Sequence, residues 1–126
     1  MKIRVNRDDY AICRLSSNED IPSWCKIEDF VTITKTEDEL SLVLKSNQIP
    51  DNIKCEKGWN ILKIVGPLDF SLIGILSKLS TILADNNIGI FVISTFDTDY
   101  ILIKKENTNN AIRVLSEKGY LLEEKE

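Results

Sequence analysis

The sequence predicts an α+β fold, and the pattern of its second half carries most of this prediction. There, short apolar runs broken by polar links predict strands, and apolar residues recur at helical spacing over two longer segments. Their order is strand, helix, strand, strand, helix, strand. This order is typical of a ferredoxin-like unit, an antiparallel sheet with helices on one face. A weak echo between residues 38–43 and 69–73 indicates a related unit in the first half.

Two strands are predicted ahead of the first helix. Residues 10–15 carry the β-branched and aromatic side chains that strands favour, and residues 30–34 alternate apolar and polar side chains. Between them, residues 16–20 are polar, which predicts a loop.

One helix is predicted in the first half. Residues 36–39 would place acidic side chains in its first turn, where the helix dipole favours them. Its apolar stripe would consist of Leu40, Val43 and Leu44. Pro50 would end the helix, and residues 53–56 could then form a short strand.

A joint between two modules is expected near Lys57-Gly58, where a glycine interrupts the apolar pattern. We therefore predict an abbreviated module over residues 1–58, because this half shows one helix where the unit has two. A complete module is predicted over residues 59–126. The chain would then be a tandem of two ferredoxin-like modules.

The second half contains the clearer elements. The expected strands cover residues 59–65, 88–95, 100–104 and 120–122, and the expected helices cover residues 71–85 and 107–118. Asn86-Asn87 should stop the first of these helices, and Gly119 should cap the second in a left-handed conformation.

Composition and charge exclude several classes of partner. The 126 residues carry 16 basic and 20 acidic side chains, a net charge of -4, without a basic cluster, so a nucleic-acid partner is not expected. The apolar runs are too short to span a bilayer, and the N-terminus lacks the apolar stretch of a signal peptide. We therefore expect a cytoplasmic protein with no membrane partner.

The cysteines and the missing histidine argue against catalysis and metal binding. Cys13, Cys25 and Cys55 have no metal-ligand spacing, so we expect buried, reduced thiols. The chain contains no histidine, which removes the usual general base and the commonest zinc ligand. No catalytic residue, metal site or cofactor is therefore predicted.

A polar break precedes the long helix of the second half. Asp69 and Ser71 are good N-cap residues, and a helix N-terminus presents free N–H groups that can hold a ligand carboxylate. Capping alone is the alternative. Gly74, within the predicted helix, costs about 1 kcal/mol relative to alanine. That cost calls for a close contact, either with a neighbouring element or with a ligand.

A second polar break, over residues 94–99, has the opposite charge. Asp97 and Asp99 would point the same way on an extended chain and repel each other unless a cation lies between them. Turn propensity alone could explain Asp97. Asp99 precedes an apolar strand and is better explained as the receptor of an ammonium group. A carboxylate site and an ammonium site together describe an α-amino acid.

These motifs resemble those of ACT domains, which are βαββαβ modules that bind amino acids and related effectors. The resemblance rests on DELS at residues 38–41, GW at 58–59, GPLDFSL at 66–72 and ISTFDTDY at 93–100. It extends over most of the chain and is strongest to short bacterial and archaeal tandem ACT proteins. These are similar to the tandem ACT proteins that sense amino acids, arginine among them, in animal cells.

The resemblance implies a ligand held between the two modules. Its site would comprise Leu68, Asp69, Phe70, Ser71, Gly74, Thr95, Phe96, Thr98 and Asp99, with Ser41 and Leu42 from the first module. Asp99 would bind the α-ammonium group. Main-chain amides near Ser71 or near Ser41 would take the carboxylate, and the choice between them stays open.

The leading functional hypothesis is therefore a regulatory sensor that binds an amino acid or a related small zwitterion. It would report to an unidentified regulated protein, and pairing as a homodimer is compatible with the family. The alternative is a protein–protein interaction module without a ligand. A third hypothesis, an enzyme that uses Asp97 and Asp99, would require turnover that either substitution abolishes.

Overall fold

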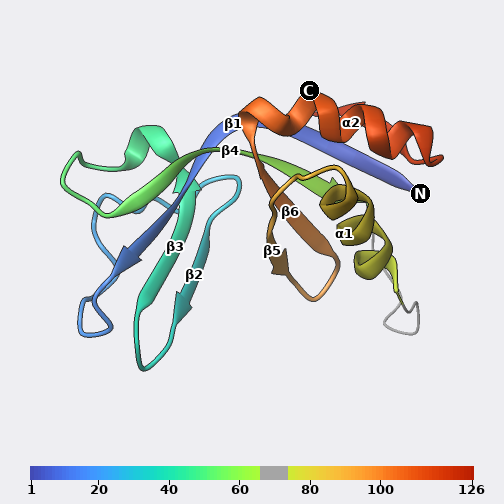
Figure 1. Ribbon diagram of the computed structural model, residues 1–126. Helices are drawn as coiled ribbons and strands as arrows, with labels where there is room; N and C mark the ends of the chain where they lie inside the picture. Colours follow the sequence, from blue (N-terminus) through green and yellow to red (C-terminus); the bar gives the residue numbers. More distant parts are fainter. Residues whose placement is uncertain (66–73) are drawn as a thin grey trace. The chain divides into compact units, whose positions relative to one another are not determined.

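The computed structural model describes residues 1–65 and 74–126, and these form two compact units (Figure 1). The inserted unit is Asp8–Trp59. The larger unit combines Met1–Arg7 with Asn60–Glu126. The N-terminal residues therefore fold with the second half of the chain, although the whole inserted unit separates the two segments in the sequence.

The larger unit contains the predicted order of strands and helices. Its elements are the first part of β1 (Lys2–Leu15), most of β4 (Cys55–Ile64), α1 (Ile75–Asp85), β5 (Phe91–Ser94), β6 (Asp99–Lys104), the 3-10 helix η2 (Lys105–Asn107), α2 (Thr108–Glu117) and β7 (Leu121–Glu124). The succession β4-α1-β5-β6-α2-β7 confirms the ferredoxin-like pattern of the second half.

β1 adds a strand inside the sheet of the larger unit, whose order is β7-β1-β4-β6-β5. It runs parallel to β7, with Lys2 opposite Leu121, whereas the prediction was an antiparallel sheet. The difference arises because β1 comes from outside the βαββαβ run, so no hairpin sets its direction. Ion pairs join these two strands, including Arg4 Nη2 to Glu123 Oε1 at 2.9 Å.

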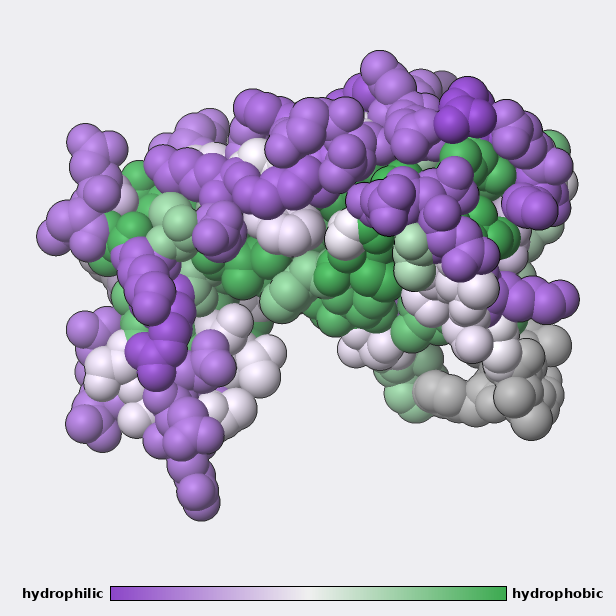
Figure 2. Space-filling view, viewed as in Figure 1, coloured by the Kyte–Doolittle hydropathy of each residue, from purple (hydrophilic) through white to green (hydrophobic). Residues whose placement is uncertain are grey.

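One apolar core holds both helices of the larger unit against the same sheet face. Every second residue of the central strands points into it, which is the alternation expected of a half-buried strand. The fully buried members include Ile3, Leu62, Ile64, Leu79, Leu83, Ile101, Ile103, Ala111 and Leu115. On the opposite side of α2, exposed Asn109, Asn110, Arg113 and Glu117 give the helix the hydrophilic outer surface seen in Figure 2.

Both helices end in the same way. Asn87 (φ 59°) follows α1 and Gly119 (φ 95°) follows α2, each in the left-handed conformation. After each of them, the next N–H reaches back to the helix: Ile88 N donates to the Leu83 carbonyl and Tyr120 N to the Leu115 carbonyl. This is the Schellman arrangement, and it confirms both predicted stops.

The start of α1 differs from the prediction of a helix beginning at residue 71. The helix begins at Ile75, and Gly74 precedes it with φ 83°. A right-handed helix cannot pass through a residue with that φ, so Gly74 bounds α1 instead of lying inside it.

The inserted unit has the strand order β2-β3-β1-β4 and no α-helix anywhere in residues 8–59. Its own elements are β2 (Thr32–Lys35), β3 (Leu40–Lys45) and the 3-10 helix η1 (Ser46–Gln48). The helix predicted after residue 36 is therefore wrong, because that segment forms a hairpin. Loop residues Trp24, Cys25, Ile49 and Ile53 cover the core of this unit.

Two features that predicted this helix, the Thr36 hydroxyl and the apolar residues after it, also fit a hairpin. The Thr36 hydroxyl accepts the N–H groups of Asp38 and Glu39, both at 3.1 Å, as a helix N-cap would. However, Thr36 N also donates to the Glu39 carbonyl at 2.9 Å, which closes a hairpin loop. Leu40, Leu42 and Leu44 then point into one core at the period of a strand.

The two hairpins are an internal repeat at a spacing of 59 positions. β2, β3 and η1 begin at residues 32, 40 and 46, and β5, β6 and η2 begin at 91, 99 and 105. Thr36 and Thr95 close the two loops with equivalent bonds, from Thr36 N to the Glu39 carbonyl and from Thr95 N to the Thr98 carbonyl. The echo expected between residues 38–43 and 69–73 has a different register, and its second half lies outside the described residues.

β4 replaces the two short strands predicted on either side of Gly58. It runs unbroken through that glycine, which adopts φ 86° and donates its N–H to Asp9 Oδ1 at 3.0 Å. The positive φ explains why a glycine occupies this position. The strand continues because Asp9 accepts a hydrogen bond from the Gly58 N–H group.

Candidate functional site

The structure brings together four of the predicted site residues. Thr95, Phe96, Thr98 and Asp99 lie in or beside the loop of the β5–β6 hairpin, in the larger unit. Ser41 and Leu42 belong to β3 of the inserted unit. The predicted residues Leu68, Asp69, Phe70 and Ser71 lie outside the described part of the chain.

The hairpin loop is held by threonine hydroxyls. Thr95 N donates to the Thr98 carbonyl at 2.8 Å, and the Thr95 hydroxyl donates to the same oxygen at 3.1 Å. Thr98 is only 5% exposed, and its hydroxyl donates to the Ile64 carbonyl at 2.6 Å. The Thr98 side chain therefore ties the loop to β4, which is a positioning role.

Asp99 presents its carboxylate at the point where the loop meets the sheet. The Ser94 hydroxyl donates to Asp99 Oδ1, and the two residues face each other across the β5–β6 pair. Asp99 is half-buried. A carboxylate held in this way is an acceptor for an ammonium group, and its position is preorganised by the strand pairing and by Ser94.

Phe96 forms the exposed tip of the same loop. Its side chain is 82% exposed, and Thr95 and Asp97 beside it are also exposed. An aromatic ring at a loop tip can cover the apolar part of a ligand or contact another protein.

Gly74 lies where α1 begins, and its backbone conformation accounts for its presence. Among the residues that the structure describes, none would lie within 4 Å of a Cβ added at this position. The close contact with a neighbouring element that the sequence left open is therefore not found in this part of the structure. A contact with a ligand stays a prediction.

Ser41 and Leu42 occupy the middle of β3, between β2 and β1. Leu42 has no exposed surface and faces the core of the inserted unit, opposite Cys13 and Ile33. Ser41 is half-buried and points the other way along the strand alternation. Of the two, Ser41 has the side chain that a ligand could reach.

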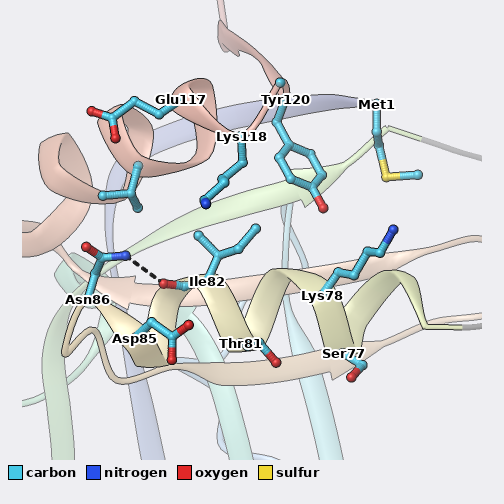
Figure 3. Close-up of a pocket in the computed structure, with 12 residues that line it drawn as sticks. Met1, Ser77, Lys78, Thr81, Ile82, Asp85, Asn86, Glu117, Lys118 and Tyr120 are labelled. Carbon is cyan, nitrogen blue, oxygen red and sulfur yellow. Dashed lines mark hydrogen bonds between the residues drawn. The ribbon is translucent and has the colours of Figure 1, made fainter.

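A cavity of about 860 Å³ lies between α1 and α2, and no predicted site residue lines it. Figure 3 shows Lys118 and Lys78 pointing toward this space, with the Tyr120 ring above it and Ile82 at its centre. Glu117, at its edge, pairs with Arg113 at 2.9 Å. The sequence gives no signal for this cavity, because its polar residues occupy ordinary solvent-facing helix positions.

We place the candidate site at the hairpin instead of at this cavity. Among the described residues, no side-chain hydrogen bond or ion pair holds Lys78 or Lys118, so binding there would have to order long, mobile side chains. Asp99 is already held by Ser94 and by the strand pair. A site that is preorganised loses less conformational entropy when a ligand binds.

Other site classes have no support in the described residues. In residues 1–65 and 74–126, no group of three cysteine, aspartate or glutamate side chains is arranged to hold a metal ion. Neither described helix has the length and hydrophobicity that a transmembrane span requires.

A family model described as "ACT domain" matches residues 54–117, and a second model, described as an N-terminal domain, matches residues 8–52. A crystal structure of a protein from Agobacterium tumefaciens is similar, with 37% identity and a TM-score of 0.92. The similarity covers 99% of this chain and 93% of that one.

Two more distant structures share the fold. A protein of unknown function from Vibrio cholerae, described as a possible transport protein, has 19% identity and a TM-score of 0.76, over 92% of this chain and 88% of that one. The regulatory subunit of aspartate kinase from Thermus flavus has 11% identity and a TM-score of 0.66, over 93% and 96% of the two chains.

These similarities agree with the geometry of the larger unit, whose succession β4-α1-β5-β6-α2 lies within the matched range. The chain belongs to the ACT domain family.

Proposed function

We propose that the protein is a regulatory sensor that binds an amino acid, or a related small zwitterion, at the β5–β6 hairpin. The arrangement around Asp99 carries this proposal: the Ser94 hydroxyl orients the carboxylate, and the Thr98–Ile64 hydrogen bond holds the loop behind it. Asp99 would accept the ligand's ammonium group. Phe96 would cover its side chain.

The remaining parts of the proposal come from the resemblance to tandem ACT proteins. The modules would be residues 1–58 and 59–126, with Met1–Arg7 contributing a strand to the second module, and the ligand would lie between them. Ser41, Leu42, Gly74 and the segment Leu68–Ser71 would complete the site. Of the two sets of main-chain amides that could hold the ligand carboxylate, we favour those near Ser71, because Ser41 lies in a strand that is paired on both sides.

The setting of the sensor is also proposed. We propose that it works in the cytoplasm, as a homodimer, and that ligand occupancy changes its contact with a regulated protein. The shared fold with a regulatory subunit of aspartate kinase supports the regulatory part of this proposal. An arginine-like ligand, as in the animal sensors, is one member of the panel that should be tested.

A thermal-stability screen with each amino acid tests the proposal. A ligand that binds the folded state stabilises it by RT ln(1 + [L]/Kd), which is about 2.7 kcal/mol at a hundredfold excess over Kd. We expect one amino acid, or a few of similar chemistry, to raise the melting temperature. The absence of a shift with any amino acid at millimolar concentration would contradict the proposal.

Asp99→Asn is the sharper test, with Asp97→Asn as its matched control. Both remove one carboxylate from the same loop, but Asp97 is exposed and Asp99 is half-buried beside Ser94. We expect Asp99→Asn to weaken binding at least tenfold, measured by titration calorimetry, and Asp97→Asn to change it less than twofold. Equal effects would remove Asp99 from the site.

The exposed Phe96 ring favours a second candidate, a module that docks a protein without any ligand. In that case Phe96→Ala would abolish capture of a stoichiometric partner, and the screen above would show no ligand. The two functions are therefore separated by whether a small molecule is needed for capture.

A further inference from the structure

All three cysteines of the chain gather in the core of the inserted unit. Cys13 lies on β1, Cys25 in the loop that follows it, and Cys55 at the start of β4. Cys13 and Cys25 are buried members of the core, Cys55 packs against it half-buried, and all three are free thiols. Three separate segments therefore bring every thiol of the protein to one place.

Cys13 and Cys55 occupy facing positions on neighbouring strands. Arg14 N donates to the Lys54 carbonyl and Val65 N to the Lys2 carbonyl, both at 3.0 Å, so β1 and β4 run antiparallel. In this register, Cys13 and Cys55 form the adjacent pair without mutual backbone hydrogen bonds. Such pairs have Cα atoms about 4.5 Å apart, within the range of about 4.4–6.8 Å that a disulfide spans.

The two thiols are close enough to influence each other's ionisation, and their surroundings make them unequal. Burial, with a smaller contribution from Cys55, raises the pKa of the Cys13 thiol to about 12, so Cys13 is protonated at neutral pH and is not the thiol that reacts first with an oxidant. Burial also raises the pKa of Cys25. Cys55 is half-buried, which makes it the sulfur that an oxidant in solution reaches first.

We propose that Cys55 and Cys13 are a redox modification site, at which a peroxide converts the two thiols into a reversible disulfide. The Cys55 thiolate attacks one peroxide oxygen, the O–O bond breaks and hydroxide leaves, which gives a sulfenic acid. The Cys13 sulfur then attacks the Cys55 sulfur, the S–O bond breaks, and the Cys13 proton leaves with the oxygen as water. Two thiols lose two electrons, and one peroxide is reduced to two waters.

Hydrogen peroxide and the full-length protein are sufficient for the test. We expect the folded protein to lose the mass of two hydrogens, and peptide mapping without reductant should find Cys13 joined to Cys55. A dithiol should reverse the change. A Cys25–Cys55 bond, or Cys55 oxidised to sulfinic acid without a disulfide, would overturn the proposal.

Single substitutions provide the controls. Cys25→Ala should form the disulfide as the parent protein does, whereas Cys55→Ser and Cys13→Ala should lose it completely. Because Cys55 is half-buried, Cys55→Ser should leave the fold intact, so it tests the proposal even if Cys13→Ala perturbs the core. In urea, oxidation should give a mixture of the disulfides that the three cysteines can form. The same mixture from the folded protein would show that the fold does not select the Cys13–Cys55 pair.

Discussion

The Thr98 hydroxyl shows how a single buried group positions the candidate site. It donates to the Ile64 carbonyl at 2.6 Å and connects the hairpin loop to β4. The sequence marks Thr98 only as part of a polar break, because the strand that contacts it lies 34 positions earlier. Long-range contacts of this kind leave no local pattern, so the sequence could predict the loop but not its anchor.

Thr98→Val keeps the shape of the side chain and removes this hydrogen bond. We expect the free energy of unfolding to fall by about 1–2 kcal/mol, because the buried carbonyl loses a partner. Thr95→Val is the control, since Thr95 is exposed and water can replace its bonds. Urea denaturation measures both, and an equal loss in the two variants would contradict the anchoring role.

Cys13 predicts a pH dependence of stability at alkaline pH. Its thiol has an ordinary pKa of 9.0, which burial raises to about 12 in the folded protein. Between these values the unfolded chain releases the thiol proton and the folded chain keeps it, so stability falls as the pH rises, by up to about 1.4 kcal/mol per pH unit. Below pH 9 this contribution is fully present.

Cys13→Ala isolates that contribution from the titration of lysine and tyrosine. Urea denaturation of the parent protein and of this variant should give a stability difference that is constant up to about pH 8.5 and changes in favour of the variant above pH 9. A difference that stays constant up to pH 10.5 would show that the thiol ionises freely in the folded state.

At the scale of elements, the ends of the helices were more predictable than the choice between helix and strand for the segment after Thr36. Asn87 and Gly119 stop their helices as expected, because a left-handed residue is a local requirement that the sequence records directly. The segment after Thr36 carries an N-cap hydroxyl and apolar residues that fit either a helix or a strand. Its pairing with β1 and β2 decides between them, and that pairing is not local.

The repeat of the two hairpins could have been found from the sequence. Thr36 and Asp38 align with Thr95 and Asp97 at a spacing of 59 positions, and apolar runs follow both pairs. The position of Asp99 corresponds to Leu40 in the first hairpin, which is buried. Of the two repeated hairpins, only the second therefore has, at this position, the carboxylate that the proposed ligand needs.

Gly119→Ala tests the helix stop, with Gly89→Ala as its control. Neither glycine has a described neighbour within 4 Å of an added Cβ, but only Gly119 has a positive φ. We expect Gly119→Ala to lower the free energy of unfolding by about 1–2 kcal/mol, because an L-residue is strained in that conformation. Gly89→Ala should change the free energy of unfolding by less than about 0.5 kcal/mol. Chemical denaturation measures both variants, and a larger loss for Gly89→Ala than for Gly119→Ala would contradict the prediction.

At the scale of the whole molecule, the contribution of Met1–Arg7 to the larger unit was the least predictable feature. The sequence shows a strand over residues 10–15, whereas β1 begins at Lys2 and places Ile3 and Val5 in the core of the larger unit. Lys2 and Arg4 alternate with Ile3 and Val5, which is itself a strand signal, but no local pattern shows what partners the charges of Lys2, Arg4 and Arg7 have. They are compensated by Glu123 and Glu124 on β7, at the other end of the chain.

Ile3→Ala tests this contribution, with Ile27→Ala as its control. Ile3 is 1% exposed within the core of the larger unit, and Ile27 is 74% exposed. We expect Ile3→Ala to cost about 2–4 kcal/mol of unfolding free energy, because it leaves a cavity among packed side chains, and Ile27→Ala to cost less than about 0.5 kcal/mol. A small loss for Ile3→Ala, seen by thermal or urea unfolding, would show that the N-terminal strand is dispensable.

The parallel pairing of β1 with β7 also determines when the fold can be completed. Arg4 and Glu123, which bond across this pair, are 119 positions apart, so one strand is synthesised long before its partner. Until β7 emerges from the ribosome, the first strand has one edge without its native partner, and the ion pairs at that edge cannot form. Completion of this sheet is therefore a late step that waits for β7, and nascent chains are exposed to misassembly until β7 is available.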